Sequence, residues 1–422
     1  MTTSSEPRWQ NCPSCGASIP VYAGYLPWCE QCEWNQKPEQ EASPNLYERI
    51  YDRIGQQRSQ SLFDQLRHAE SLQAQLTLSK LLAYGIAVGV YACIFAFAVL
   101  GIWLIVVNWP NIVGGIVGAL FLLLAWVARP RFDHMPTQIA PMSDLPSLYE
   151  LTNKIACTIG APPVDAIRID ASFNASFAQI GVKRTRVLSL GLPLWTLLTD
   201  QERIALLGHE LGHCVNGDPN RGLIVGSAIN TLASWSELLH PGPAASSAIG
   251  ILLLPFTLLM IGVAKGVRLL FYALIHLLWQ DSQRAEYLAD HLGATVGGSN
   301  SMLLLLNQLA LSATFWNTLQ RTSLAGAGQE LDFFQELRHQ MEIVPLRERE
   351  RIKRVTLKEE SRLDATHPPT VYRIEMLKIH PVATGQVILS SELSERIENE
   401  LIPVRRRVQK ELVDLYRQSI YY

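Results

Sequence analysis

An HExxH sequence near the middle of the chain carries the residues best suited to chemistry. His209 and His213 are four residues apart, so on a helix both imidazoles lie on one face and can bind one Zn²⁺. Glu210 projects beside them and is placed to act as a general base. A helix with two exposed histidines gives the same pattern by chance, so further residues must decide between these interpretations.

The sequence around this motif predicts a helix. Thr199 and Glu202 have the spacing of a capping box at a helix N-terminus. Ile204, Leu207 and Leu211 then give the helix an apolar face. We therefore expect the HExxH residues on a helix that is packed against the rest of the protein.

A catalytic zinc site needs a third protein ligand, because water must hold the fourth position. Residues 284–290, with the sequence RAEYLAD, offer Glu286, and Asp290 follows one turn later on the same helical face. Glu286 can bind the metal, while Asp290 can hydrogen-bond an imidazole N–H and fix its tautomer. On its own this pair is an ordinary solvated helix face, but its place after the HExxH helix makes it a candidate part of the site.

Two CxxC pairs occupy the start of the chain. They are formed by Cys12, Cys15, Cys29 and Cys32, and this spacing is typical of a zinc ribbon in which four thiolates hold one Zn²⁺. A redox or disulfide pair is the alternative. A four-cysteine site has no open position, so we expect this zinc to be structural. The aromatic residues around it either pack the small fold or bind a partner protein.

The composition favours a membrane protein, because 48% of the residues are hydrophobic and only 18% are charged. Residues 81–107 contain no charge, and residues 112–128 add a second apolar stretch, which predicts a transmembrane helical hairpin over 81–128. The alternative is a buried helical pair in a soluble core. The net charge of −2 gives no general attraction for nucleic acid, and we expect none to bind.

Basic residues flank both ends of this hairpin, and its connecting turn carries no charge. By the positive-inside rule, the N-terminus and the catalytic residues face the cytoplasm of a multi-pass protein in the cell membrane. A further apolar stretch lies at residues 221–279. If Glu286 is to meet His209, this stretch crosses the membrane twice or not at all, and a shallow or protein-buried helix is the alternative to a crossing.

Three motifs in order give the chain its resemblance to a known family. They are GHELGHCVNGD at residues 208–218, RAEYLAD at 284–290 and THPPTVYRIEML at 366–377, and a hydrophobic hairpin precedes them. With these motifs the chain resembles the integral-membrane zinc metallopeptidases of the HtpX and CAAX prenyl protease group. The resemblance covers about residues 80 to 380 and is closer to the HtpX-like bacterial branch. The zinc ribbon is an addition to the usual pattern.

The resemblance implies roles for individual residues. It makes His209, His213 and Glu286 the zinc ligands and Glu210 the base. Asp290 is then a residue that contacts a ligand without binding the metal itself. The resemblance also implies that two residues of the third motif hold the substrate carbonyl or the oxyanion, namely His367 and Arg373. The family's substrate-pairing strand is approximated by the segment that begins at Asn174 and Ala175, between strands that we predict at residues 166–170 and 186–190.

These observations predict a mainly α membrane protein with one or more transmembrane hairpins. Its catalytic domain is expected to be mostly helical, of the zincin type (gluzincin), with a small β-sheet. The predicted divisions are a zinc ribbon at 1–37, a linker and juxtamembrane helix at 38–80, the hairpin at 81–128, a first catalytic part at 129–220, the second apolar pair at 221–279 and a second catalytic part at 280–422. The charged residues at 347–354 are predicted to be a solvated helix face.

The predicted function is a membrane-anchored zinc-dependent endopeptidase with one catalytic and one structural Zn²⁺. Its expected partners are the lipid bilayer, polypeptide substrates such as membrane or unfolded proteins, and a protein that binds the zinc ribbon. Protein quality control in the membrane is the expected role. Two alternatives are a CAAX-type processing protease and a non-catalytic membrane scaffold that uses the ribbon to bind partners.

Overall fold

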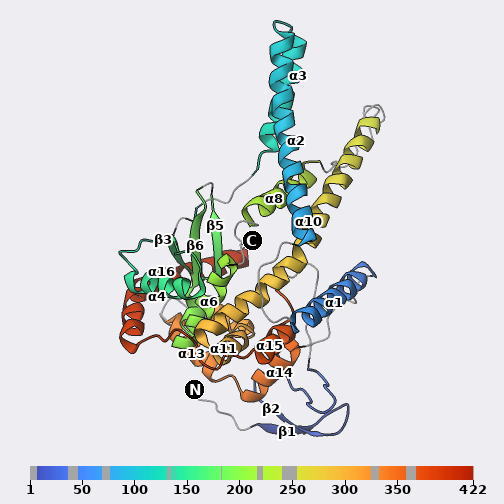
Figure 1. Cartoon of the computed structure of the whole chain (residues 1–422). Coiled ribbons are helices and arrows are strands. Elements are labelled where there is room, and N and C mark those ends of the chain that lie inside the picture. The colour runs from blue at the N-terminus through green and yellow to red at the C-terminus, as the bar shows by residue number, and fades with distance from the viewer. Residues whose placement is uncertain are drawn as a thin grey trace.

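The computed structural model describes residues 7–36, 46–68, 77–130, 135–136, 138–181, 183–215, 222–239, 254–324, 332–357 and 367–421. The predicted linker at 38–45 lies outside the described residues, as does the middle of the second apolar stretch, residues 240–253. Figure 1 shows a mostly helical molecule with a small sheet and long helices that project from one side. This is the predicted fold class.

Helices and strands follow one another along the chain in this order: β1 (Arg8–Asn11), β2 (Ser18–Val21), α1 (Leu46–Leu66), α2 (Leu78–Asn108), α3 (Ile112–Val127), β3 (Ile139–Ala140), α4 (Pro146–Ile159), β4 (Ala166–Asp170), β5 (Ala175–Ile180), β6 (Thr185–Gly191), α5 (Leu192–Trp195), α6 (Asp200–Val215), the π-helix η1 (Gly222–Gly226), α8 (Ser227–Leu238), α10 (Leu254–Gly297), α11 (Ser299–Leu309), α12 (Ser312–Leu324), α13 (Phe333–Glu342), α14 (Leu346–Leu357), α15 (Thr370–Ile379) and α16 (Ser391–Tyr421).

A four-stranded sheet with the order β3-β4-β6-β5 lies beside the helical core. β4 and β6 are parallel, and the other pairs are antiparallel. The strands predicted at 166–170 and 186–190 are β4 and β6. Their alternate residues, such as Ile167 and Leu188, are fully buried in the core, as the strand period requires. β6 is paired on both sides, and β3 and β5 are the two edge strands of this sheet among the described residues.

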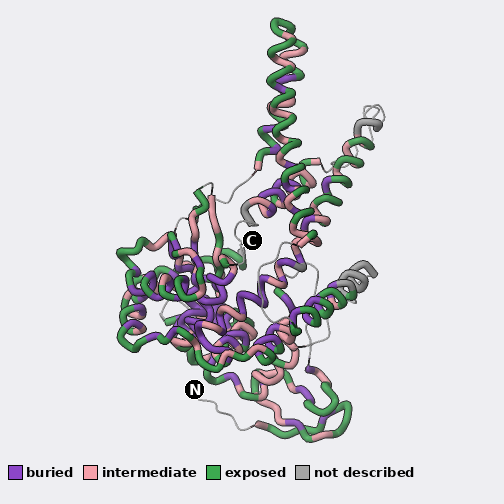
Figure 2. Tube along the Cα trace, viewed as in Figure 1, coloured by how far each residue is buried: buried purple, intermediate pink, exposed green. Residues whose placement is uncertain are grey.

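The predicted hairpin is formed by α2 and α3, which project away from the sheet (Figure 1). Thr77 and Asn111 cap the two helices through their side-chain oxygens. Large apolar residues along both helices are exposed, including Phe95, Trp103 and Ile112, and Figure 2 shows how much of the hairpin is exposed. Such a surface is suited to lipid contact and is costly in water.

Among the described residues, two helices are long and apolar enough to cross a membrane, namely α2 and α10. The apolar helix α3 is shorter, at 16 residues. At about 1.5 Å per residue it measures about 24 Å, somewhat less than the roughly 30 Å of a hydrocarbon core. α8 is only 12 residues long, and Ala228 and Leu232 on it are buried against other helices. The second apolar stretch therefore begins with a short, protein-packed helix.

Helix α10 has two parts with different surroundings. Its first part exposes Leu258 and Leu269, as a lipid-facing helix does. Its last part, from Asp281 onward, is buried in the peptidase core and contacts α6 along its length. One continuous helix thus connects the apolar region to the HExxH helix.

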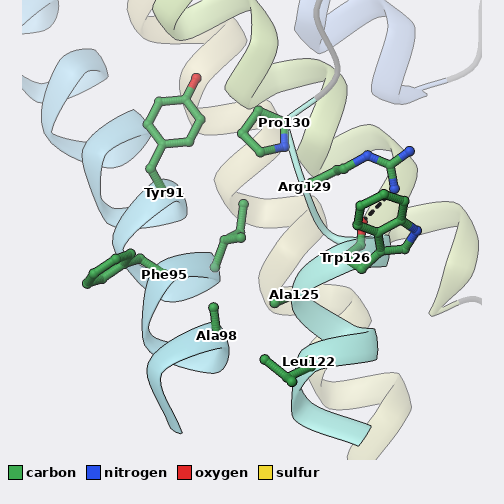
Figure 3. Close-up of a pocket in the computed structure, with 9 residues that line it drawn as sticks. Tyr91, Phe95, Ala98, Leu122, Ala125, Trp126, Arg129 and Pro130 are labelled. Atoms are coloured by element: carbon green, nitrogen blue, oxygen red, sulfur yellow. Dashed lines mark hydrogen bonds between the residues drawn. The ribbon is translucent and has the colours of Figure 1, made fainter. Parts of the chain in front are cut away.

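An open pocket of about 520 Å³ lies between α2 and α3, and Figure 3 shows the residues that line it. Phe95, Leu122 and Trp126 line it, and Arg129 lies over the Trp126 ring at 4.0 Å from its centroid. The lining is almost entirely apolar. This pocket belongs to the hairpin, and the HExxH residues lie elsewhere, on α6.

Candidate metal centre

Helix α6 presents the HExxH residues. Glu202 accepts a hydrogen bond from the backbone N–H of Thr199 at 2.7 Å, as half of the predicted capping box. The apolar residues Ile204, Leu207 and Leu211 are fully buried. Burial of this face against the core fixes the rotation of the helix about its axis, and hence the direction of the histidines.

Close packing with α10 brings the third predicted ligand to α6. A Cβ atom added to Gly293 would lie 2.8 Å from the carbonyl oxygen of Ala205, and one added to Gly212 would lie 3.0 Å from the Cα of Ala289. A Cβ atom added to Gly208 would likewise be too close to the side chain of Val296. Side chains at these glycines would push the two helices apart. These glycines were not predicted from the sequence as contact residues, although glycines spaced four apart at 208 and 212 are a signal for close helix contact.

His209, His213 and Glu286 meet where α6 and α10 cross. His209 Nε2 lies 3.7 Å from Glu286 Oε2, and His213 Nε2 lies 3.6 Å from Glu286 Oε1. One ligand atom from each residue lies within 4.8 Å of the other two. Ligands about 2.1 Å from a tetrahedral zinc ion are roughly 3.4 Å from one another, so this donor set fits zinc in both type and spacing.

Asp290 lies behind the cluster and orients its first histidine. Its Oδ1 is 2.9 Å from His209 Nδ1, so the opposite ring nitrogen, Nε2, points toward Glu286. The carboxylate is held in turn by Arg373, whose Nε and terminal nitrogen donate to its two oxygens at 2.7 and 2.6 Å. Burial alone would raise the pKa of Asp290, but Arg373 and His209 outweigh it and lower the pKa. The carboxylate is therefore ionised.

The two residues predicted to bind the oxyanion occupy different places. His367 is half exposed at the rim, with Nδ1 2.7 Å from Glu286 Oε2. Arg373 is buried, and its guanidinium donates hydrogen bonds to both carboxylate oxygens of Asp290. This geometry supports the oxyanion role for His367 and a positioning role for Arg373.

Glu286 itself is ionised in these surroundings. Its carboxyl is only 7% exposed, and burial would raise its pKa. The hydrogen bond with His367 and the charges of His209 and Arg373 together have the larger effect and lower the pKa to about 2. An ionised carboxylate is the form that binds a metal ion.

The predicted substrate-pairing residues lie at the start of β5, which contacts α6. The carbonyl oxygen of Asn174 accepts from the backbone N–H of Gly191 at 2.8 Å, and Ala175 is opposite Leu190 in the β5–β6 pair. From the sequence, an extended substrate was expected to add a strand beside residues 174–178 or beside residues 186–190. The interpretation for residues 186–190 is wrong, because β6 is the inner strand between β4 and β5 and both of its edges are paired.

The four N-terminal cysteines form a second cluster. Cys12 Sγ lies 3.6 Å from Cys32 Sγ, and Cys15 Sγ lies 3.6 Å from Cys29 Sγ. Thiolates about 2.3 Å from a tetrahedral zinc ion are about 3.8 Å apart, so the four sulfur atoms also fit zinc.

The helical fold, the HExxH helix and the converging carboxylate together define a membrane-associated metallopeptidase of the zincin type. The model of peptidase family M48 matches residues 146–380, more than half of the chain, and the chain belongs to this family. The matched range includes the three converging residues His209, His213 and Glu286. It also includes Asp290, His367 and Arg373.

Three curated relatives carry the name HtpX. The chain is 27% identical to Protease HtpX homolog of Syntrophobacter fumaroxidans over 56% of its own length and 77% of the relative's. It is 26% identical to Protease HtpX homolog 1 of Sulfurisphaera tokodaii, over 34% of the chain and 47% of the relative, and 29% identical to Protease HtpX of Xylella fastidiosa, over 36% and 53%. The matches thus span about half the length of two relatives and about three quarters of the third. No solved structure matches the chain.

Proposed function

We propose that this protein is a membrane-anchored, zinc-dependent endopeptidase. The observation that carries the proposal is the convergence of His209, His213 and Glu286, with Glu210 on the same helix. A purely structural zinc site needs the two histidines but has no use for a carboxylate at position 210. The scaffold alternative is weaker for that reason.

The three converging residues hold the catalytic zinc in this proposal. Bound there, zinc would supply Lewis-acid chemistry for a water molecule and for the scissile carbonyl. Glu210 accepts the proton of the attacking water and passes it to the leaving amine. His367 lies at the exposed rim and donates a hydrogen bond to the oxygen on which negative charge develops. Asp290 and Arg373 keep the His209 ring in place throughout.

The substrate adds a strand to the free edge of β5. Asn174 O bonds to Gly191 N, and the register is continuous through Ser176 opposite Ser189. Because facing groups alternate along an antiparallel pair, Ser176 also turns its backbone groups to β6, whereas Ala175 and Phe177 turn theirs to the free edge. These edge groups pair with an extended substrate segment of nearly any sequence. That manner of binding suits unfolded or membrane-derived polypeptides better than one short processing signal.

The apolar helices anchor the enzyme in the cell membrane as a multi-pass protein with its termini and peptidase residues in the cytoplasm. Support comes from the exposed apolar surface of α2, from the length of α10 and from the basic residues at the ends of the hairpin. The second zinc is held by the four N-terminal cysteines. A reducing cytoplasm keeps these thiols available as ligands.

The test is cleavage of unfolded casein and of a prenylated peptide by the detergent-solubilised protein and by Glu210→Gln, with zinc measured on both. We expect cleavage of casein by the wild type. Glu210→Gln should retain the same zinc content and lose activity by a factor of about 10² to 10⁴, because it keeps the ligands and loses the base. Cleavage of the prenylated peptide alone supports the CAAX-type alternative, and zinc binding without any cleavage supports the scaffold.

A further inference from the structure

The zinc ribbon places one tryptophan against the peptidase part of the chain. Trp28 is only 2% exposed, although it belongs to a domain with a very small core. Its ring lies against two arginines of α14, with the guanidinium carbon of Arg347 4.5 Å and that of Arg354 5.3 Å from a ring centroid. Figure 1 shows the two ribbon strands next to α14. Cations over an indole face are attracted by its π-electrons.

Backbone contacts extend this interface along one face of α14. Arg347 donates to the carbonyl oxygen of Trp28 at 2.7 Å, and Arg351, one turn later, donates to that of Gln36 at 3.0 Å. Arg354, three residues further, pairs with Glu30. The arginines at 347, 351 and 354 share one helical face. The charged stretch that we predicted to be solvated is therefore the surface that holds the ribbon.

The cysteine cluster fixes the loop that makes these contacts. Trp28 immediately precedes Cys29, which is completely buried. The apolar core of the ribbon consists of Cys12, Ile19 and Cys29, packed against a few half-buried neighbours. A core this small does not hold a fold without a metal, so the shape of the Trp28 loop depends on the cysteines being linked through an ion.

We propose that zinc binding by the four cysteines docks the ribbon onto α14 and makes it a structural part of the peptidase unit. The ribbon face that carries Trp28 is occupied by the chain's own arginines and is not a free surface for another protein. α14 contacts α15, the helix that carries Arg373, so the ribbon supports the peptidase core from the side opposite the membrane hairpin (Figure 1). This inference does not depend on peptidase activity.

Hydrogen exchange on the full-length protein in detergent, together with zinc analysis, tests the proposal. Cys12→Ser/Cys15→Ser removes two thiolates of the cluster. We expect its zinc content to fall from about two ions per chain to about one. Exchange of the α14 amides, residues 346–357, should speed up by at least about tenfold, because α14 loses its partner. Exchange in α6 should not change, which shows that the peptidase core is still folded.

A matched pair of substitutions separates docking from general damage to the ribbon. Trp28→Ala and Trp9→Ala remove the same side chain from the same small domain, but Trp28 is buried under the arginines and Trp9 is 66% exposed. Trp28→Ala should increase α14 exchange by about tenfold or more with zinc retained, and Trp9→Ala should leave it unchanged. Arg347→Ala changes only the α14 side and should have the same effect as Trp28→Ala.

Two results would overturn the proposal. One is a Cys12→Ser/Cys15→Ser protein with the same zinc content as the wild type. The other is unchanged α14 exchange in both Cys12→Ser/Cys15→Ser and Arg347→Ala while α6 stays protected. In that second case the ribbon is a tethered module, and its exposed aromatic Trp9 is the place to look for a partner.

Discussion

Arg373 holds Asp290 through two parallel hydrogen bonds of 2.6 and 2.7 Å, and both side chains are buried behind His209. A fork of this kind fixes a carboxylate in both position and orientation. Asp290 in turn lies 2.9 Å from His209 Nδ1, and this contact fixes the orientation of the His209 ring. Arg373 also lies 3.8 Å from Glu286 Oε2, so it is in contact with both carboxylates around His209.

Arg373→Lys should weaken zinc binding at the catalytic site by about 10- to 100-fold, because lysine cannot bind both oxygens of Asp290 in the same fork. Asp290→Asn should have a similar effect. Zinc affinity measured with competing chelators gives the answer. Arg396→Lys is the control, because Arg396 pairs with Glu150 at the surface, where both side chains are more than half exposed. If Arg373→Lys lowers kcat and leaves zinc affinity unchanged, Arg373 contacts the substrate after all.

His367→Leu should behave in the opposite way. Its imidazole is half exposed at the rim of the site, so we expect kcat to fall by about 10² to 10³ from the loss of one hydrogen-bond donor to the oxyanion, with a smaller loss of zinc affinity than in Arg373→Lys. Steady-state kinetics on casein and the same chelator titration separate the two quantities. A large loss of zinc with unchanged kcat in the loaded enzyme would instead make His367 a support for Glu286.

Gly293→Ala should loosen the crossing of α6 and α10. The added methyl group would lie 2.8 Å from Ala205 O and 3.3 Å from His209 N, atoms that cannot move without moving the helix. We expect a loss of about 1–3 kcal/mol in stability and weaker zinc binding. Gly266→Ala on the same helix is the matched control. It meets nothing within 4 Å, and alanine favours the helix, so thermal unfolding should stay the same or rise.

Ala175→Pro tests the free edge of β5. The proline ring replaces an N–H that points away from β6, so the sheet keeps its own hydrogen bonds while the substrate loses one donor. We expect the unfolding temperature to fall by only a few degrees and kcat/KM on casein to fall by about tenfold. Ser176→Pro removes an N–H that faces Ser189 on β6, and it should lower the unfolding temperature much more. Normal kcat/KM in Ala175→Pro would argue against substrate pairing at this edge.

Cysteines added on the two sides of the molecule, with labelling compared to that of the wild type and its seven native cysteines, test the membrane orientation. Trp109, at the tip of the hairpin, is 80% exposed, and Leu346, at the start of α14, is 84% exposed. In whole cells, a membrane-impermeant maleimide should label Trp109→Cys and leave Leu346→Cys unlabelled, because of these two positions the hairpin tip is the one that faces outward. Both should react after lysis. Labelling with the reverse preference contradicts a cytoplasmic peptidase.

Local spacing in the sequence was enough to predict several elements. The apolar period around Ile204 and the cap at Thr199 predicted α6, and the strand-like residues at 166–170 and 186–190 predicted β4 and β6. The uncharged run from residue 81 predicted α2. Each of these signals lies within one element, because helix and strand periods and hydrogen-bonded caps are set by neighbours a few residues apart.

The tertiary structure decided which faces meet. Arg373 and Asp290 are 83 residues apart in the chain, and Arg347 and the carbonyl group of Trp28 are 319 apart, so no local pattern connects them. An arginine-rich helix face has the same sequence whether it faces water or a ribbon. Only the packing of α14 beside the ribbon determines that it binds Trp28, and only the glycine contacts between α6 and α10 bring Glu286 to the two histidines.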